Sequence, residues 1–171
     1  MTIVRSFEEL KDLVSRLNVK STTKLISVDG FAGAGKDMVS SYLSEILSIP
    51  VVYLNDFFSR DQKVLESFKF ENFAQAIAKL KQNSSVIVGG ILVQDVLARV
   101  NIKPDVLLYV KRVNQYGLWV DGFKLDKFIR LGDASAASNF DLFQDQLVQY
   151  HLRVHPHERA DIIVEHVEGS A

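Results

Sequence analysis

Short apolar runs alternate with helical stretches along this chain. Val-, Ile- and Leu-rich runs predict five strands, at residues 25–28, 51–54, 86–88, 105–110 and 160–165. Helical apolar spacing predicts helices between them, over residues 36–47, 71–82, 93–100 and 140–153, with one or two more in 113–130. Because strands alternate with helices, we predict an α/β fold in which helices cover both faces of a parallel sheet.

The two ends of this pattern are less regular. Ser6 to Glu9 has the spacing of a capping box, so residues 1–21 are predicted to form an N-terminal helix running to about Leu17. The stretch LGDASAAS at 131–138 is small and polar, and we expect it to be mobile.

Composition narrows the classes of function. The 171 residues suit a single domain, 1–171, and a net charge of −1 favours neither nucleic acid nor an anionic membrane as a partner. The absence of cysteine excludes disulfides and thiolate catalysis. The N-terminus has no apolar signal core, and no apolar run is long enough for a membrane span, so a cytoplasmic location is the default expectation.

The strongest motif follows the first predicted strand, in DGFAGAGKDM at 29–38. Its Gly30-x-x-x-x-Gly35-Lys36 spacing, between a strand and a helix, is typical of a loop whose backbone N–H groups surround phosphate oxygens. Lys36 would reach the terminal phosphates. The alternative is a Gly/Ala-rich turn that only joins two elements. The predicted nucleotide-binding residues are Gly30, Phe31, Ala32, Gly33, Ala34, Gly35, Lys36, Asp37 and Met38.

Asp37 stands where such loops place a serine or threonine that binds Mg²⁺. A carboxylate can also bind Mg²⁺ through oxygen, and Asp37 is therefore the predicted metal ligand. Its charge would make nucleotide binding depend more strongly on the metal. The alternative is that Asp37 only favours the start of a helix.

The polar ends of the predicted strands should meet at one edge of the sheet, which is where ligands of such folds bind. These ends are Asp29-Gly30, Asn55-Asp56, Gly89-Gly90 and Lys111-Arg112.

Together with the loop, several segments resemble the uridine kinase and phosphoribulokinase family of P-loop kinases. They are YLNDFFSR at 53–60, VIVGGILV at 86–93, DVLLYVKR at 105–112 and RADIIVE at 159–165, with LDKFIRLG at 125–132 similar to the lid pattern through Asp126 and Arg130. The resemblance covers roughly residues 22–165. It implies a P-loop NTPase fold with a five-stranded parallel sheet in three α/β/α layers, and a lid at 112–140. It also implies ATP- and Mg²⁺-dependent phosphorylation of a hydroxyl on a nucleoside or similar small molecule.

The resemblance also implies roles for individual residues. Lys36, Asn55, Asp56 and Arg130 would be catalytic, while Asn55, Asp56 and Phe58 would contact the acceptor. Phe58 can also be explained as packing within the surrounding aromatic cluster, and Arg130 as part of a solvated basic helix face.

Four positions depart from the family pattern. Asn55 replaces the family's acidic base, Gly89 replaces the acid after the third strand, Leu125 replaces the leading arginine of the lid, and Asp37 replaces the hydroxyl. Neighbouring strand residues point to opposite sides, so Asp56 can replace the base only if the strand has already ended. Asp37 would restore the charge lost at Gly89.

Three functions stay open at this point. The first is a small-molecule kinase, and the second is a catalytically impaired nucleotide-binding protein that acts as a sensor. The third is a GTPase or ATPase switch, which the absence of N-K-x-D and D-x-x-G motifs disfavours. The acceptor and the choice between ATP and GTP are not specified. A homo-oligomer is compatible with the sequence.

Overall fold

Six strands form one parallel sheet in the computed structural model, which describes residues 1–19, 21–59, 62–131 and 142–167, without the side chains of 128, 130, 131 and 142. Their order across the sheet is β1-β6-β5-β2-β4-β3, and every pairing is parallel. The strands are β1 (Thr2–Val4), β2 (Leu25–Gly30), β3 (Val51–Tyr53), β4 (Val86–Gly89), β5 (Val106–Val113) and β6 (Ile162–Val167).

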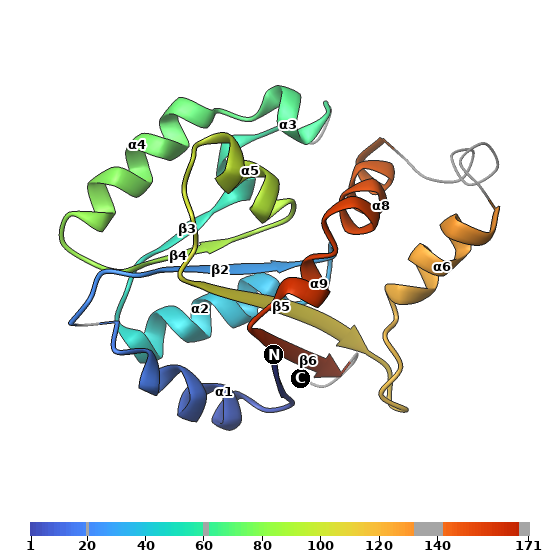
Figure 1. Cartoon of the computed structure of the whole chain (residues 1–171), viewed down its shortest axis with the longest axis horizontal. Coiled ribbons are helices and arrows are strands. Elements are labelled where there is room, and N and C mark those ends of the chain that lie inside the picture. Colours follow the sequence, from blue (N-terminus) through green and yellow to red (C-terminus); the bar gives the residue numbers. More distant parts are fainter. Residues whose placement is uncertain (20, 60–61, 132–141, 168–171) are drawn as a thin grey trace.

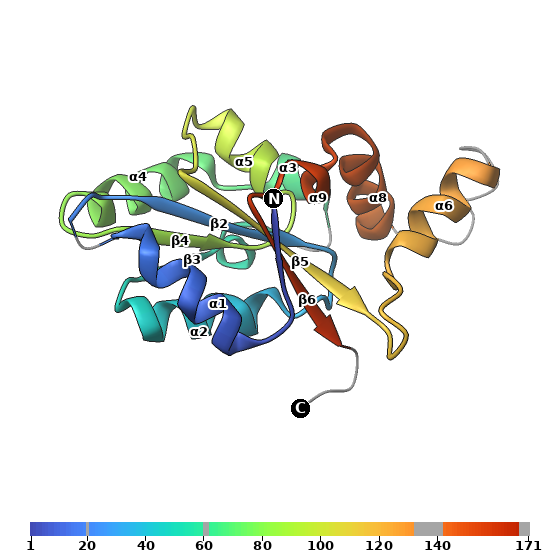
Figure 2. The same ribbon diagram turned by 60° about the horizontal axis from the view of Figure 1, so that its bottom comes forward.

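Helices cover both faces of this sheet (Figures 1 and 2). One face carries α1 (Phe7–Val14) and α2 (Lys36–Leu47), and the other carries α4 (Phe70–Lys81), α5 (Val93–Arg99) and α9 (Pro156–Arg159). Two helices, α6 (Gly122–Leu131) and α8 (Leu142–Val154), stand beyond the carboxyl ends of the central strands (Figure 1). The short elements are η1 (Ser15–Leu17), η2 (Leu54–Phe57) and α3 (Val64–Ser67). This arrangement confirms the predicted three-layer α/β fold.

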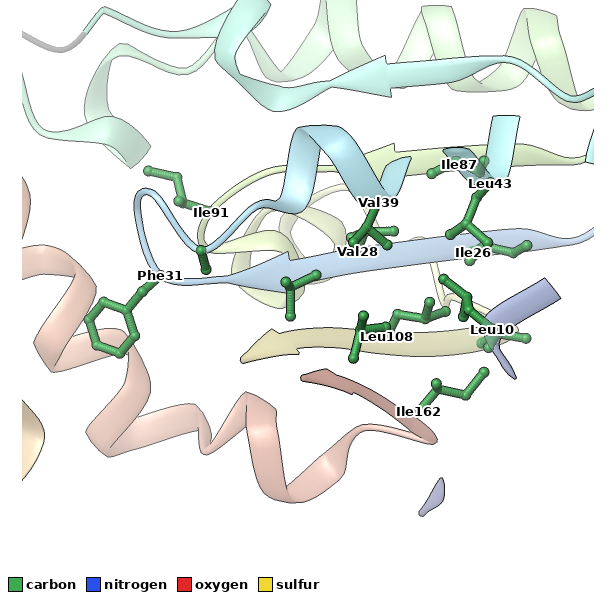
Figure 3. Close-up of a cluster of buried hydrophobic side chains, with 14 of the residues drawn as sticks. Leu10, Ile26, Val28, Phe31, Val39, Leu43, Ile87, Ile91, Leu108 and Ile162 are labelled. Atoms are coloured by element: carbon green, nitrogen blue, oxygen red, sulfur yellow. The ribbon is translucent and has the colours of Figure 1, made fainter. Parts of the chain in front are cut away.

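Alternation along the strands divides the core between the two faces. In β2, Ile26 and Val28 pack towards α1 and α2, where they meet Leu10 and Val39 (Figure 3). Leu25 belongs to the cluster on the opposite face, with side chains from α4, α5 and the end of β3. That cluster includes Leu54, Phe68, Phe73, Ile77, Val86, Val88, Val93 and Leu97. Since both faces of β2 are buried, polar groups on this strand must find partners inside the protein.

The sixth strand, β1, was not predicted from the sequence. The capping box at Ser6 is present, since its hydroxyl accepts the Glu9 N–H at 3.1 Å. However, residues 1–21 are not one helix, because β1 precedes α1 and pairs with β6, Thr2 lying opposite Ile162. The predicted five-stranded sheet is therefore extended by one edge strand.

Residues 113–121 also differ from the predicted helices. β5 continues to Val113, and the chain then turns back, since the Val120 N–H donates to the Arg112 carbonyl at 2.9 Å. The helix begins at Gly122. Residues 132–138 of the segment expected to be mobile lie outside the described residues. In the part of the chain that the structure describes, no helix is long and apolar enough to cross a membrane.

The packing of α1 gives the first prediction. Leu10 is fully buried against the sheet, so Leu10→Ala should lower the free energy of unfolding by about 2–5 kcal/mol. The measurement is urea-induced unfolding. Lys11→Ala, at an exposed position of the same helix, is the control and should change stability by less than about 0.5 kcal/mol. Equal stability of the two variants would show that α1 is not part of the core.

Candidate functional site

The turn from β2 into α2 contains the predicted phosphate loop. β2 ends at Gly30, and α2 begins at Lys36 with Gly35 as its N-cap at φ 92°. At Gly30 the backbone has φ 154°, and a Cβ would lie 2.7 Å from the Val110 carbonyl oxygen on the neighbouring strand. Only glycine fits here, because the loop passes directly against β5.

A cavity of about 380 Å³ lies over this loop. N–H groups of the first helical turn have no acceptors within their own helix, and the positive end of the helix dipole lies at the same place. An anionic group in the cavity would accept hydrogen bonds from these N–H groups and would be attracted by the helix dipole. The cavity is lined by Ala32, Gly33, Gly35, Lys36, Asp37, Met38, Asn55, Ile91 and Phe143.

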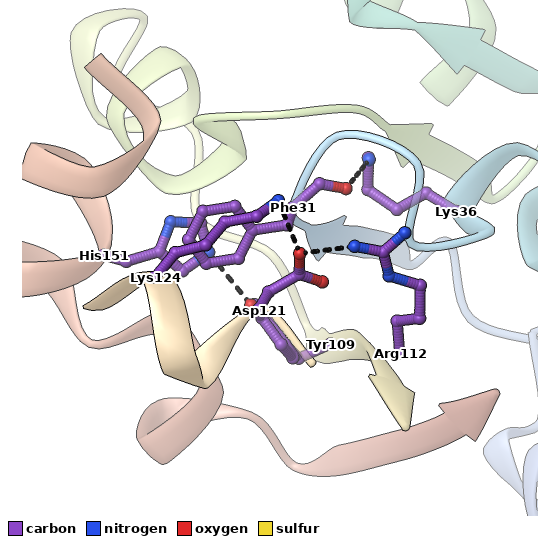
Figure 4. A network of polar contacts seen from close by, with 7 residues as sticks. All are labelled: Phe31, Lys36, Tyr109, Arg112, Asp121, Lys124 and His151. Atoms are coloured by element: carbon purple, nitrogen blue, oxygen red, sulfur yellow. Dashed lines mark hydrogen bonds and ion pairs between the residues drawn. The ribbon is translucent and has the colours of Figure 1, made fainter. Parts of the chain in front are cut away.

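Seven of the predicted site residues line this cavity, and three of them, Lys36, Asp37 and Asn55, bring polar or charged side chains to it. Lys36 is buried, and its ammonium donates a hydrogen bond to the Phe31 carbonyl at 2.6 Å, so the side chain folds back over its own loop (Figure 4). Asp37 is exposed in the first turn of α2, and Asn55 reaches the cavity from η2. Because β3 ends at Tyr53, the residues after it no longer alternate as they would in a strand.

Among the described residues, the predicted acceptor residues Asp56 and Phe58 lie outside the lining of this cavity, as do Gly30, Phe31 and Ala34 of the loop. Asp56 is exposed on η2. Phe58 is half-buried and packs against Phe68, with ring centroids 6.5 Å apart. Arg130 lies on α6, but its side chain is outside the described residues.

Gly89 packs tightly against α2. A Cβ at this position would lie 2.5 Å from the Ser40 hydroxyl oxygen, which is fully buried and has no hydrogen-bond partner among the described residues. An acidic side chain at residue 89 would therefore collide with α2. The Ser40 hydroxyl thus occupies the space that a side chain at residue 89 would need.

A buried carboxylate organises the cations near the loop, which the sequence analysis did not anticipate (Figure 4). Asp121 is fully buried, and its Oδ1 accepts hydrogen bonds from Arg112 at 2.9 Å and Lys124 at 3.0 Å. The Lys124 ammonium also lies 5.7 Å from the centroid of the Phe31 ring. Asp121 thus holds two positive charges beside the phosphate loop.

Helix α8 contacts the loop through a buried histidine. The His151 ring stacks on Phe31, with centroids 3.8 Å apart. Its Nδ1 lies 2.6 Å from the Leu147 carbonyl and its Nε2 2.9 Å from the Tyr109 hydroxyl, so Nδ1 donates and Nε2 accepts. Burial lowers the pKa of His151 to about 3, which keeps the ring neutral.

A second contact from α8 reaches the residue before the loop. Asp29 is buried at the end of β2, where its Oδ1 accepts the Gly30 N–H at 2.7 Å and its Oδ2 accepts a short hydrogen bond from the Tyr150 hydroxyl. Burial raises the pKa of Asp29 to about 7, although both hydrogen bonds and the attraction of Lys36 act in the opposite direction.

A smaller cavity of about 200 Å³ lies on the other side of Met38. It is mainly apolar, and it includes the residues that follow β1 as well as the end of β6. Arg5 and Glu165 form an ion pair at 2.8 Å on its wall. The lining consists of Arg5, Ser6, Phe7, Met38, Val39, Val164, Glu165, His166 and Val167. Met38 lines both cavities, so the two are adjacent.

The remaining lid and metal residues can now be placed. Leu125, at the position of the family's leading lid arginine, is buried in the main core. Within the described ranges, no group of three or more His, Cys, Asp or Glu residues could hold a metal ion. A metal at the loop would therefore depend on Asp37 together with oxygens of a bound ligand.

Comparisons with known proteins support the fold. No protein-family model matches the sequence, and no curated protein matches it significantly. A solved structure described as a possible uridine kinase from Bacillus stearothermophilus aligns with a TM-score of 0.57 at 13% identity, covering 92% of this chain and 96% of that one. An uncharacterized protein from Eubacterium ventriosum aligns at 17% identity over 85% and 89% of the two chains, with a TM-score of 0.42 that is too low to bear on the fold. The chain therefore shares the overall α/β fold of the structure described as a possible uridine kinase.

The contact between Gly89 and Ser40 gives the second prediction. Gly89→Ala should lower the free energy of unfolding by about 1–3 kcal/mol, because the added methyl group overpacks the interface with α2. Adding Ser40→Ala should recover most of this loss. Ser41→Ala is the control, because the Ser41 hydroxyl bonds instead to Tyr53 and its removal should recover nothing. Additive losses in the Gly89→Ala/Ser40→Ala double mutant would contradict the contact.

Proposed function

We propose that the protein binds a nucleoside triphosphate at the phosphate loop and transfers its terminal phosphate to a hydroxyl of a small molecule, such as a nucleoside. The observation that carries this proposal is the single cavity that contains Lys36, Asp37 and Asn55 above the loop amides. Phosphoryl transfer depends mainly on positioning and charge neutralisation, and these are the groups it requires.

The pair of adjacent cavities supports a nucleotide as the ligand. Phosphates would occupy the cavity over the loop, and the apolar cavity beyond Met38 would take the base. In this arrangement Phe7, which follows β1, forms part of the wall for the base. The N-terminal segment would then contribute to nucleotide binding as well as to the sheet.

Each residue has a separate task in this proposal. Lys36 exchanges its hydrogen bond with the Phe31 carbonyl for one with a phosphate oxygen. Asn55 holds the acceptor hydroxyl through its side-chain amide, and Asp56 and Phe58 lie further along the same segment. Arg130 on the lid helix is proposed to approach the transferred phosphate.

Asp37 fits a magnesium ion, since it offers an exposed carboxylate at the cavity wall. When bound, Mg²⁺ would neutralise phosphate charge during transfer. Asp37 would contribute one oxygen ligand, and the negative charge of Asp37 would otherwise disfavour a polyphosphate. Nucleotide binding should for this reason require the metal.

A catalytically impaired sensor is the second candidate. It is favoured by Gly89, where the Ser40 hydroxyl occupies the space of a side chain, and by the amide of Asn55 in place of an acid. A general base contributes about 10²–10⁴-fold to such reactions, so its loss slows a kinase without abolishing it. The two candidates share nucleotide binding and differ in turnover.

The first test of this function is thermal unfolding with ATP, GTP and ADP, each with and without Mg²⁺. A ligand at about 100 times its Kd should stabilise the protein by about 2.7 kcal/mol, which gives a clear rise in Tm. Lys36→Ala should abolish the rise, because it removes the cation that meets the phosphates.

Lys79→Ala is the matched control, since Lys79 is an exposed lysine on α4, a helix that contributes no residue to the cavity. It should respond to nucleotide as the wild type does. No Tm rise with any nucleotide would refute the proposal, whereas a rise without Mg²⁺ would refute the role of Asp37.

Asn55→Asp tests the kinase against the sensor. This variant restores a carboxylate beside the acceptor position. Because a general base contributes about 10²–10⁴-fold, kcat should rise above that of the wild type by up to this factor, with a smaller effect on KM. The measurement is transfer of labelled γ-phosphate to a panel of nucleosides.

Asn55→Ala is the companion variant, and it should lower turnover and raise KM for the acceptor. If the wild type and Asn55→Asp both bind nucleotide but transfer no phosphate to any acceptor, the protein is a sensor. Turnover by Asn55→Asp no higher than that of Asn55→Ala would exclude Asn55 from the acceptor site.

A further inference from the structure

Asp29 is a buried acid that phosphoryl transfer itself does not use. It is 3% exposed, and it lies directly before the phosphate loop, where it fixes the N–H of Gly30. Its second oxygen is held by Tyr150 from α8, a residue 121 positions away in the sequence. The start of the loop is thus anchored through one carboxylate.

The groups around Asp29 make its charge state sensitive to what occupies the loop. From α2, the positive charge of Lys36 attracts the carboxylate, and from α5, the negative charge of Asp95 repels it. On β5, Tyr109 lies opposite Asp29 in the strand register and is buried, with His151 of α8 bonded to its hydroxyl. On the other side, β4 continues with the glycines of residues 89 and 90, which do not titrate.

We infer that Asp29 is a proton-linked positioning residue, which takes up a proton from solvent when an anionic phosphate ligand binds at the loop. Two changes on binding act in the same direction. The ligand brings negative charge close to Asp29, and the ligand's phosphates neutralise Lys36, the cation that attracts Asp29. Both changes favour the neutral carboxylic acid. This inference rests on the proposed binding of nucleotide.

The sign of the pH dependence follows from the free protein. Since the pKa of Asp29 is raised to about 7 by burial, the acid is already protonated below neutrality and nothing is taken up there. Above neutrality the Asp29 carboxylate of the free protein is ionised, so on this inference nucleotide binding is accompanied by protonation of Asp29. The Kd for nucleotide should therefore be constant below neutrality and rise above it, by up to about tenfold for each pH unit.

The test is isothermal titration calorimetry of the full chain with ADP at saturating Mg²⁺, on both sides of neutrality and in buffers of different ionisation enthalpy. Above neutrality the wild type should take up close to one proton more per nucleotide than Asp29→Asn, whose Kd should not show this pH dependence. Asparagine keeps the shape of Asp29 and can still accept the Gly30 N–H. Protons exchanged by the nucleotide itself cancel in this comparison.

Two further variants should shift the pH dependence in opposite directions. Tyr150→Phe removes a hydrogen bond that lowers the pKa of Asp29, so the rise in Kd should begin at a higher pH than in the wild type. Asp95→Asn removes a repulsion that raises this pKa, so the rise should begin at a lower pH. A purely structural role would change affinity equally at every pH. These variants also keep the inference testable if Asp29→Asn does not fold.

The outcomes separate this inference from the proposed function. Nucleotide binding with the same proton uptake in the wild type and Asp29→Asn would overturn the inference and leave the function intact. If the wild type binds no nucleotide, both are overturned.

Discussion

The carboxyl end of β2 is enclosed on every side, and the site depends on this enclosure. The strand is buried on both faces and lies between β4 and β5, so the chain that leaves it must pass within contact of the Val110 carbonyl. Glycine at residue 30 makes that passage possible. The polar side chain just before it can be accommodated only with internal partners, which Tyr150 and the Gly30 N–H provide. The position of the loop, the direction of α2 and the attachment of α8 all follow from this local constraint.

Local patterns in the sequence were sufficient for strands β2 to β6, for most of the helices and for the position of the glycine-rich loop before α2, because each is specified by neighbouring residues. They were insufficient where the partners are distant. β1 has only three residues, and it becomes a strand through its pairing with β6 at the opposite end of the chain. The network around Asp121, and the contacts of His151, likewise join segments that no periodicity connects. An acidic residue at the end of a strand with two buried faces does predict a buried carboxylate that accepts hydrogen bonds. The role of Asp29 could have been predicted in this way.

The departures from the kinase pattern are not independent of their surroundings. Gly89 is matched by the Ser40 hydroxyl, which fills the space that a side chain would need. Leu125 has joined the hydrophobic core, so a residue expected to face a ligand instead attaches α6 to the body of the protein. Asp37 and Asn55, in contrast, both remain at the cavity over the loop. The departures from the family pattern are therefore of two kinds. Gly89 and Leu125 are part of the packing, whereas Asp37 and Asn55 keep polar groups at the cavity.

The pairing of β1 with β6 also constrains how the protein is made. The Thr2 N–H bonds to the Asp161 carbonyl at 2.8 Å, and Arg5 is paired with Glu165, 160 positions further along the chain. During synthesis, the first strand must therefore stay unpaired until the residues of β6 have left the ribosome. All residues of the β2–β5 region leave the ribosome before those of β6, so the edge pairing with β1 cannot form before them. A nascent chain that stalls before residue 162 would carry an open edge at β5 and an N-terminal strand without a partner, and such an edge is a template for pairing with another chain.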